Sequence, residues 1–225
     1  MTPVRSFSPA VEDYLKAIYR LETETGGPVT TNALGGWLGL TASSASGMLR
    51  KLDDLQFIVY MPYHGVRLSE SGRRAALAVV RRHRLLETFL AQALRLSWDK
   101  VHDEAEALEH AASAELCEAI AAVLGDPRTD PHGDPIPTRD GRVLETPSRA
   151  LGSLRPRQRG RVVRVSDRDP AVLRSLTERG IALGDVLTVS GVRPGGTVAV
   201  AVRFGTHLLD PHVTAAIRVA LEDGQ

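Results

Sequence analysis

The sequence lacks the features of secreted, membrane-spanning and strongly charged proteins. It has a single cysteine, Cys117, which excludes an internal disulfide and indicates a reducing compartment. No apolar run is long enough to cross a bilayer, and the first residues contain no signal-peptide core. The 28 Lys and Arg residues nearly balance the 27 Asp and Glu residues, so a basic surface can arise only from local clustering. We therefore expect a cytoplasmic protein with no membrane partner.

Motifs of the common enzyme classes are also missing. The zinc-protease string His-Glu-x-x-His does not occur, and neither Glu87 nor Glu106 has the histidine three residues later that ferritin-like di-metal oxidases need. There is no phosphate loop, no dinucleotide fingerprint and no Ser-His-Asp context. We predict that the chain is not an enzyme and takes no small-molecule substrate.

Three helices are predicted at the start of the chain. In the first, Ser8 is the expected N-cap, Pro9 occupies the first helical position, and apolar residues recur at helical spacing as far as Leu21. The second, within "TTNALGGWLGL", is short, and each of its glycines weakens it by up to about 1 kcal/mol relative to alanine. The third begins after Thr41 and has an apolar stripe that ends at Leu55.

A β-hairpin is predicted after the third helix. The short runs Ile58 to Met61 and Val66 to Leu68 flank the turn residues "PYHG". Three helices followed by a hairpin is the winged-helix order. The tight turn between Leu38 and Thr41 matches the helix-turn-helix motif.

Helices continue through the middle of the chain and then give way to short strands. A long helix over roughly residues 72–94 precedes two helices that Ser97 and Ser113 are expected to cap. From Asp126 to about Arg159 the chain is rich in Pro, Gly and Arg, which predicts a linker or an irregular segment, in which His132 is a structural turn residue. The alternating runs beyond it predict a small β-barrel with one helix. The predicted domains are residues 1–73, 74–145 and 146–225.

The segment "VHDEAEALEH", residues 101–110, gathers potential metal ligands. In a helix, His102, Glu106 and His110 follow one another at a spacing of four, and Glu109 lies three residues beyond Glu106. Such spacings place side chains on one face, with β-carbons about 5–6 Å apart. Imidazoles and carboxylates are the ligands of Mn²⁺, Fe²⁺ and Zn²⁺.

The preceding helix carries a similar pair, His83 and Glu87, also at a spacing of four. The alternative is that all these side chains belong to solvated surface faces, which is the better explanation of an isolated pair. Here six residues lie on two neighbouring helices, and the carboxylates would repel one another without a cation or many donors among them. Metal binding is the better explanation, but the pattern alone does not identify the metal.

Four stretches together resemble a known family: "VEDYLKAIY", "RRHRLLETFL", "WDKVHDEAEALEH" and "DPHGDPIP". The chain resembles, over essentially its whole length, the diphtheria-toxin-repressor family of metal-dependent transcriptional repressors, and most of all the manganese-regulator branch. The resemblance implies a mainly α fold with a small β part. Its parts are an N-terminal winged helix-turn-helix, a helical metal-binding and dimerisation domain, and a C-terminal SH3-like small β-barrel.

The resemblance also implies a primary metal site with the ligands Asp13, Glu106, Glu109 and His110. In the iron-responsive branch the positions of Asp13 and Glu106 carry Met and Cys. Here both are carboxylates, a hard oxygen set that suits Mn²⁺. Fe²⁺, Zn²⁺ and Co²⁺ are possible substitutes.

An ancillary site is implied as well, at His83, Glu87 and His102, with a further ligand from the barrel for which Asp169 is the candidate. Some manganese regulators carry a glutamate one turn after the aspartate of the first helix, where this chain has Lys16. This difference favours two separated sites over one paired binuclear site.

The third helix and the wing supply the expected DNA contacts. Small hydroxyl residues can approach base edges, and basic residues suit phosphates. The predicted DNA-binding residues are Thr41, Ser43, Ser44, Ser46, Arg50, Lys51 and Arg67. The alternative is that Ser and Thr only cap and solvate the helix; the resemblance favours DNA contact. The arginine-rich run from Arg155 to Arg168 is interpreted as a flexible, solvated segment, with DNA contact as the alternative.

These predictions combine into three hypotheses. The first is a Mn²⁺-activated homodimeric repressor, in which metal joins the DNA-binding and dimerisation domains on palindromic promoter DNA of metal-uptake genes. The second is the same repressor responding mainly to Fe²⁺ or Zn²⁺. The third, from a different class, is a metal-dependent hydrolase or a metal-storage protein.

Overall fold

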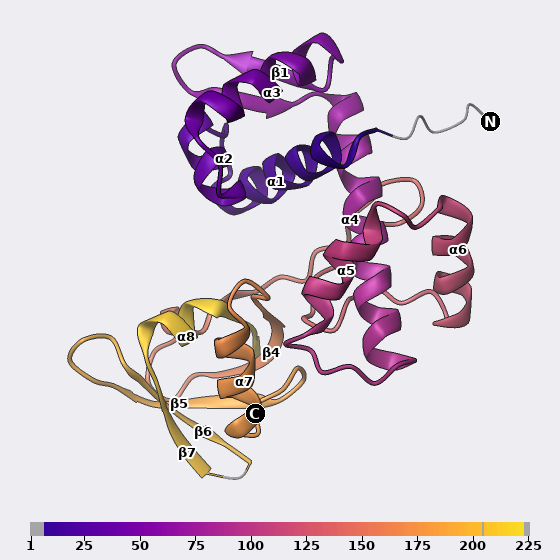
Figure 1. The fold of residues 1–225 in the computed structure, drawn as a ribbon. Coiled ribbons are helices and arrows are strands. Elements are labelled where there is room, and N and C mark those ends of the chain that lie inside the picture. Colours follow the sequence, from indigo (N-terminus) through magenta and orange to yellow (C-terminus); the bar gives the residue numbers. More distant parts are fainter. Residues whose placement is uncertain (1–6, 204, 223–225) are drawn as a thin grey trace. The chain divides into compact units, whose positions relative to one another are not determined.

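The structure of the chain is a computed structural model that describes residues 7–203 and 205–222 (Figure 1). The chain divides into two units. One contains the chain up to His83 together with Pro137–Arg142, and the other contains Arg84–Ile136 together with the chain from Val143 onward. The division falls inside helix α4 (Glu70–Gln92), so the domain boundaries proposed near residues 73 and 145 stay predictions.

Helix α1 (Pro9–Thr25) opens the first unit as predicted. Ser8 is its N-cap residue and Pro9 its first helical residue, although the Ser8 side chain makes no capping hydrogen bond. The helix ends at Gly26, whose φ of 70° lies in the left-handed region that glycine adopts without strain. Its apolar stripe is buried against the rest of the unit, with Ile18 fully inaccessible.

Helices α2 (Thr31–Leu38) and α3 (Ala42–Asp54) form the helix-turn-helix. The side chain of Thr41 accepts a hydrogen bond from the backbone N–H of Ser44, which confirms the predicted N-cap. Gly35 lies within α2, where a β-carbon would lie 2.9 Å from the carbonyl oxygen of Leu40 in the following turn. A close backbone approach therefore explains this glycine, whereas Gly36 has no such neighbour.

The predicted hairpin is confirmed as strands β1 (Ile58–Met61) and β2 (Gly65–Leu68), which pair antiparallel. Ile58 and Val66 are buried, whereas the other residues of β1 are exposed. Val66 also forms a bridge with Val29, which ties the hairpin to the segment between α1 and α2. The helix-turn-helix and its wing therefore form one packed unit.

Helices of the second unit follow α4. Helix α5 (Val101–Glu109) has Lys100 at its N-cap, so the cap predicted at Ser97 is wrong. Helix α6 (Ala114–Val123) begins after Ser113, which accepts a hydrogen bond from the N–H of Leu116 as predicted. Together with the later turns of α4 they enclose an apolar core. Its members include Leu85, Leu86, Leu90, Val101, Ala105, Cys117 and Ile120.

The rest of the second unit is built on an antiparallel sheet with the strand order β3-β8-β4-β5-β6-β7 (Figure 1). The strands are β3 (Arg149–Ala150), β4 (Arg159–Val165), β5 (Val186–Val192), β6 (Val198–Val202), β7 (Gly205–Leu209) and β8 (Ile217–Glu222). The connections contain the 3₁₀ helix η1 (Leu151–Ser153), α7 (Pro170–Glu178) and α8 (Pro211–Ala216). The predicted fold class, helical domains followed by a small β-rich domain, is confirmed.

Of the two alternatives for the segment from Asp126 to about Arg159, the structure supports the irregular one as far as β3, because residues 126–148 form no helix or strand, but part of this segment is packed and is not a solvated linker. Asp130 and His132 are buried, and the segment around them folds into a tight turn. The glycine of this turn, Gly133, has φ of 87°, and a β-carbon there would lie 2.1 Å from a backbone oxygen of β4. The glycines and prolines that indicated a linker serve this close packing instead.

No helix among the described residues is both long enough and apolar enough to cross a membrane.

Candidate metal centre

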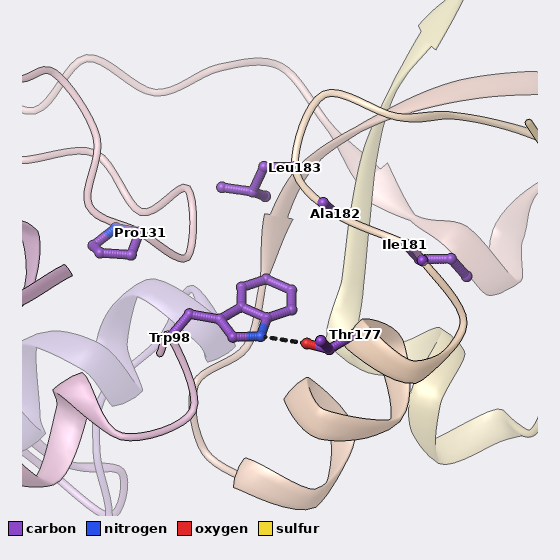
Figure 2. Close-up of a pocket in the computed structure, with 7 residues that line it drawn as sticks. Trp98, Pro131, Thr177, Ile181, Ala182 and Leu183 are labelled. Carbon is purple, nitrogen blue, oxygen red and sulfur yellow. Dashed lines mark hydrogen bonds between the residues drawn. The ribbon is translucent and has the colours of Figure 1, made fainter. Parts of the chain in front are cut away.

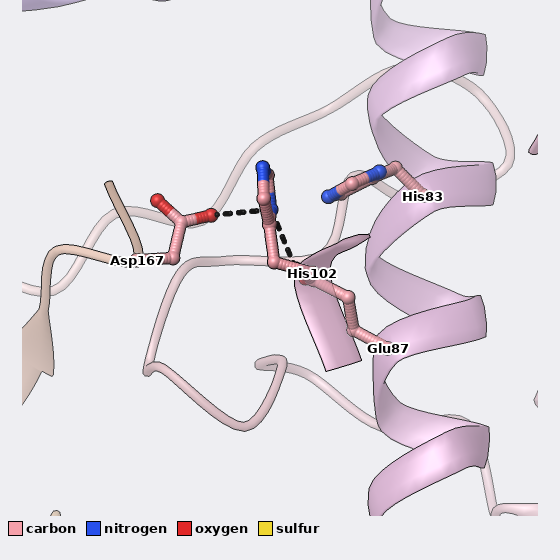
Figure 3. A group of neighbouring side chains, drawn as sticks. All are labelled: His83, Glu87, His102 and Asp167. Carbon is pink, nitrogen blue, oxygen red and sulfur yellow. Dashed lines mark hydrogen bonds and ion pairs between the residues drawn. The ribbon is translucent and has the colours of Figure 1, made fainter. Parts of the chain in front are cut away.

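A buried carboxylate on α4 anchors the candidate centre. Glu87 is fully inaccessible, because it lies on the same stretch of α4 as core leucines Leu85 and Leu86. Its Oε1 atom lies 3.2 Å from Nδ1 of His102 on α5. The same Nδ1 lies 3.1 Å from Oδ2 of Asp167, in the loop between β4 and α7. Two helices and a loop thus bring an imidazole between two carboxylates (Figure 3).

The imidazole of His102 is strongly affected by this position. Burial alone would lower its pKa, but hydrogen bonds to Asp167 and Glu87, together with their negative charge, raise the pKa to about 10. In the metal-free protein the ring is therefore protonated at neutral pH. A cation that displaced this proton would take its place between the same carboxylates.

His83 lies one turn before Glu87 on α4 and is 1% exposed. His83, Glu87, His102 and Asp167 each offer one ligand atom within 4.8 Å of the others. Figure 3 shows the His83 ring extending from the helix toward His102. Two nitrogen and two oxygen ligands at such spacings fit a divalent transition-metal ion.

A second group shares Glu87. Glu87, Asp130 and His132 are all buried and also offer ligand atoms within 4.8 Å of one another. His132 Nε2 lies 2.6 Å from the carbonyl oxygen of Trp98, so this nitrogen carries the hydrogen that is donated. The other ring nitrogen, Nδ1, has no hydrogen-bond partner among the described residues and lies 3.8 Å from Glu87 Oε1. That distance is too long for a hydrogen bond but suits two ligands of one cation.

Asp130 is held in place by backbone groups. Its Oδ1 accepts hydrogen bonds from the N–H groups of His132 and Asp134, at 2.8 and 2.9 Å. Complete burial raises the pKa of the Asp130 carboxyl well above its usual range, and the charges of Asp134 and Glu87 raise it further. Arg84 opposes this effect.

Arg84 balances one side of the acidic region. Its guanidinium donates to the carbonyl oxygen of Pro135 at 2.6 Å and to Asp134 at 3.1 Å, and its Nε lies 3.6 Å from Asp130. Arg164 reaches Asp134 from β4, also at 3.1 Å. The region around Asp134 is thus neutralised by protein cations, whereas Glu87 and Asp167 lie beside the protonated ring of His102.

Further potential ligands lie on α5. Glu109 is fully buried, and its Oε1 lies 3.6 Å from Nε2 of His110, the residue that ends the helix. Glu106 Oε1 lies 3.6 Å from Nε2 of His102. Asp13, the fourth predicted primary ligand, lies on α1 in the first unit and is half-buried. The predicted primary set is therefore divided between the units, and it stays a prediction.

One predicted ligand is placed elsewhere. Asp169 is the N-cap of α7, where its Oδ1 accepts from the N–H of Ala171 and its Oδ2 lies 3.0 Å from His212. These contacts lower the pKa of the Asp169 carboxyl, with the His212 hydrogen bond as the main cause. The carboxylate beside His102 is that of Asp167, two residues earlier. We therefore correct the assignment from Asp169 to Asp167.

The predicted DNA-binding residues line α3 and the wing. Ser43, Arg50 and Lys51 are exposed on α3, and Arg67 is exposed on β2. Others are engaged by their own helix. Thr41 and Ser44 form the cap with hydroxyls 3.0 Å apart, and the hydroxyl of Ser46 donates to the carbonyl oxygen of Ala42.

A cavity of about 470 Å³ lies near the candidate centre, lined by Trp98, Pro131, Thr177 and residues 180–183 (Figure 2). Its lining contains no charged side chain, so it offers no metal ligand set. The indole N–H of Trp98 donates to the Thr177 hydroxyl at 2.9 Å. This bond ties the segment before α5 to α7 and fixes the Trp98 carbonyl that His132 binds.

Three ligand candidates of this centre were missed by the sequence prediction: Asp130, His132 and Asp167. None lies on a helix with periodic partners, so the spacing signal that predicted His102 and Glu106 was absent. The available signal was the density of His and Asp in "DPHGDP", which was interpreted as a turn.

Comparisons with known proteins give consistent matches along the chain. Residues 6–66 match the iron dependent repressor N-terminal DNA binding domain, residues 69–138 match the iron dependent repressor metal binding and dimerisation domain, and residues 149–221 match the FeoA domain. A solved structure of a manganese-dependent transcriptional repressor in complex with manganese is 44% identical, with a TM-score of 0.89. The match covers 94% of this chain and all of that one.

Other relatives are more distant. The structure of ScaR with bound Zn²⁺ is 25% identical with a TM-score of 0.81, over 93% of this chain and 98% of that one. The diphtheria toxin repressor of Corynebacterium jeikeium is 34% identical over 137 residues, which are 61% of this chain. The match spans only 57% of the length of that repressor.

Proposed function

Because the chain belongs to the diphtheria-toxin-repressor family of metal-dependent transcriptional repressors, we propose that it is a Mn²⁺-activated homodimeric repressor of metal-uptake genes. The observation that carries this proposal is the buried cluster around Glu87 and His102, in a chain whose first unit is a helix-turn-helix with a wing. Its expected place of action is promoter DNA in the cytoplasm.

The prediction that the chain is not an enzyme is confirmed by its membership in a family of transcriptional repressors. The hypothesis of a metal-dependent hydrolase or storage protein is therefore set aside. The family matches include a DNA-binding domain and a dimerisation domain, which supports an operator and a second copy of the chain as partners.

The proposed primary site uses Asp13, Glu106, Glu109 and His110. Burial supports a ligand role for Glu109, since a fully inaccessible carboxylate requires compensating positive charge or donors. Three carboxylates and one imidazole form a hard ligand set that suits Mn²⁺. When bound, Mn²⁺ supplies the positive charge that balances these carboxylates.

The proposed second site uses His83, Glu87, His102 and Asp167, with His132 and Asp130 as further candidate ligands around Glu87. The orphaned Nδ1 of His132 and the two carboxylates on either side of His102 support a cation at this position. Occupation requires His102 to lose its proton, so metal competes with hydrogen ions there.

The proposed switch acts through the chain's own ligands. Asp13 belongs to the helix that precedes the helix-turn-helix, and the other primary ligands belong to α5. Ligation of both to one ion would restrict the motion of the DNA-binding helices in a dimer. Only a difference in metal affinity between the DNA-competent state and other states can drive this change.

An alternative metal is supported by a specific observation. The second cluster contains His83 and His102, and two imidazoles with carboxylates also suit Zn²⁺ and Fe²⁺. The similar repressor ScaR was solved with bound Zn²⁺. The response to Fe²⁺ or Zn²⁺ is therefore the second candidate function.

Fluorescence anisotropy of the protein on its upstream DNA tests the proposal, first with chelator and then with Mn²⁺, Fe²⁺, Zn²⁺ or Co²⁺. We expect tight binding with Mn²⁺ and none with chelator. The double variant Asp13→Met/Glu106→Cys, with softer ligands, is expected to shift the response toward Fe²⁺. Equal binding with chelator and with metal contradicts metal activation, and preference of the natural sequence for Fe²⁺ or Zn²⁺ favours the second candidate.

A further inference from the structure

A turn on the β-rich part of the second unit concentrates unpaired positive charge. Arg155, Arg157 and Arg159 lie between η1 and the start of β4, and all three are exposed. Within the described part of the chain, none of their side chains has a hydrogen-bond or ion-pair partner. Three guanidinium groups therefore lie within five residues without a counter-charge.

The turn is a fixed structure, contrary to the expectation of a flexible, solvated segment. The Arg155 N–H donates to Gln158 Oε1 at 2.7 Å, and the Gln158 N–H donates to the Arg155 carbonyl oxygen at 3.0 Å. The Arg157 N–H and the Gln158 carbonyl oxygen bond to the backbone of Val189 on β5, at 2.7 and 3.0 Å. The arginines are thus presented from a backbone that is bonded to the sheet.

Arg157 occupies a position that its side chain disfavours. Its φ of 73° is left-handed, which costs a residue with a β-carbon roughly 1–2 kcal/mol and costs glycine nothing. The left-handed φ of Arg157 and its repulsion by two neighbouring unpaired arginines each lower the stability of the fold. A role outside the fold explains why both unfavourable features occur together.

Arg161, the next arginine on β4, is neutralised by contacts within the barrel. Arg161 Nε donates to Glu222 at 2.8 Å, and its Nη1 donates to the carbonyl oxygen of Gly184. Glu222 is also the cross-strand partner of Arg159. Its carboxylate is bonded to Arg161, and no ion pair within 4.0 Å joins it to Arg159. Among the described arginines of β4, Arg161 and Arg164 are thus paired with carboxylates, whereas Arg159 is not.

We propose that the turn of Arg155, Arg157 and Arg159 is a second DNA-contact surface that binds backbone phosphates of the duplex on which α3 is bound. This inference rests on the proposed function as an operator-binding protein. Guanidinium groups pair with phosphate oxygens in bidentate geometry, and such contacts need charge and position but no apolar surface. The turn exposes only Pro156 besides its arginines, which does not provide the apolar centre of a protein interface.

The DNA-binding unit offers few exposed cations on α3 and the wing. Its α3 offers Arg50 and Lys51 as exposed cations, and β2 adds Arg67. Once α3 is bound to an operator, the duplex is present at high effective concentration for other parts of the same chain. A cationic turn would then add affinity without sequence specificity.

The test compares charge variants of the full-length protein with saturating Mn²⁺, by anisotropy on the upstream duplex over a range of NaCl concentrations. The triple variant R155Q/R157Q/R159Q is expected to bind at least about tenfold more weakly, with a slope of log affinity against log salt that is less steep by about 2–3, since each phosphate contact contributes about 0.9. The matched control R161Q/R174Q/R179Q removes the same charge from arginines that bond to Glu222, Asp99 and Ser175. It is expected to keep the natural slope.

A single substitution separates a DNA role from a structural one. Arg157→Gly relieves the left-handed strain, so its melting temperature is expected to rise, whereas its salt slope is expected to fall by about 1. A structural role would not change stability and DNA binding in opposite directions.

Duplex length supplies a further check, because shortening the DNA on both sides of the operator should remove the difference in affinity between the natural protein and the triple variant.

The inference is overturned if the triple variant keeps natural affinity and salt slope, or if the control triple variant loses as much affinity. If the natural protein fails to bind any upstream duplex with metal, the proposed function fails first. If the natural protein binds with metal and the triple variant R155Q/R157Q/R159Q keeps natural affinity and salt slope, the proposed function stands and only the second contact surface is wrong.

Discussion

Helix α3 in the first unit and the cluster around Glu87 in the second hold their polar side chains in opposite ways. On α3 the polar residues are exposed, and Thr41 and Ser46 form hydrogen bonds within their own helix. Around Glu87 the polar side chains are buried and come from α4, α5 and two loops. The exposed side chains of α3 are solvated, so they cost no stability. The side chains around Glu87 must be balanced by a cation or by hydrogen-bond partners for the fold to be stable.

This contrast predicts where stability and function are coupled. Changes on α3 should affect DNA binding and, apart from loss of the Thr41 cap, leave the free energy of unfolding nearly unaffected. Changes in the buried cluster should affect unfolding, metal binding and, through metal, DNA binding.

The largest effect is expected for Arg84→Met. Removal of this guanidinium leaves the buried Asp130 and the half-buried Asp134 with less positive charge, which should lower the free energy of unfolding by about 3–5 kcal/mol. The matched control Arg74→Met removes an exposed i,i+4 pair with Glu70 and should cost less than about 1 kcal/mol. Urea unfolding followed by circular dichroism measures both. Equal losses would contradict the contrast between buried and exposed charges.

Metal should be the next largest contribution. Mn²⁺ at a hundred times the dissociation constant of one site should raise the free energy of unfolding by about 2.7 kcal/mol, because the folded state binds it and the unfolded state does not. Thermal unfolding with chelator and with Mn²⁺ gives this increment. His102→Leu should reduce this increment, and Ser43→Ala, which changes an exposed residue of α3 outside the cluster, should leave it unchanged. An increment that survives in His102→Leu without reduction would remove His102 from the site.

The pH dependence of the metal-free protein should follow His102. Its pKa is about 10 in the folded protein, because Asp167 and Glu87 stabilise the protonated ring, and near the ordinary histidine value of 6.5 when unfolded. The stability that it contributes is therefore fully present below pH 6.5 and is lost as the pH rises toward 10. Denaturant unfolding at pH 6 and pH 9.5, with chelator, measures the loss. In His102→Gln the loss should be smaller, and an unchanged pH dependence in that variant would contradict the assignment.

The smallest effect is expected on α3. Thr41→Ala removes the N-cap and should lower the free energy of unfolding by about 1 kcal/mol. Ser43→Ala, two residues later and with no local bond among the described residues, should change it by less than about 0.5 kcal/mol. Both variants are expected to weaken operator binding in an anisotropy titration. Natural affinity in Ser43→Ala would remove that residue from the DNA contact.

The contrast also explains what could be predicted from the sequence. The helix-turn-helix, the hairpin and the potential ligands on α4 and α5 follow from local spacing, capping residues and turn residues. Thr41 and Ser113 were predicted as caps and serve as caps. These features depend on neighbours in the chain, which the sequence displays directly.

The remaining features depend on residues that are distant in the chain. Asp167 lies beside His102 only because the loop after β4 reaches α5, and Asp169 caps α7 only because that helix begins at Pro170. His132 is buried because Gly133 permits close packing against β4. Pro- and Gly-rich composition is the same for a solvated linker and for a packed irregular segment, so composition alone did not distinguish the two.

Two aspartates separated by one residue provide the most direct test of the buried metal cluster. Manganese bound by the full-length protein can be counted by electron paramagnetic resonance of free Mn²⁺ during a titration, for Asp167→Asn and Asp169→Asn in parallel. The account predicts that Asp167→Asn binds one ion fewer per chain, or binds it at least about tenfold more weakly, as loss of a ligand or its supporting partner does. Asp169→Asn should keep the natural stoichiometry. Loss of an ion in Asp169→Asn, with natural binding in Asp167→Asn, would contradict the site described here.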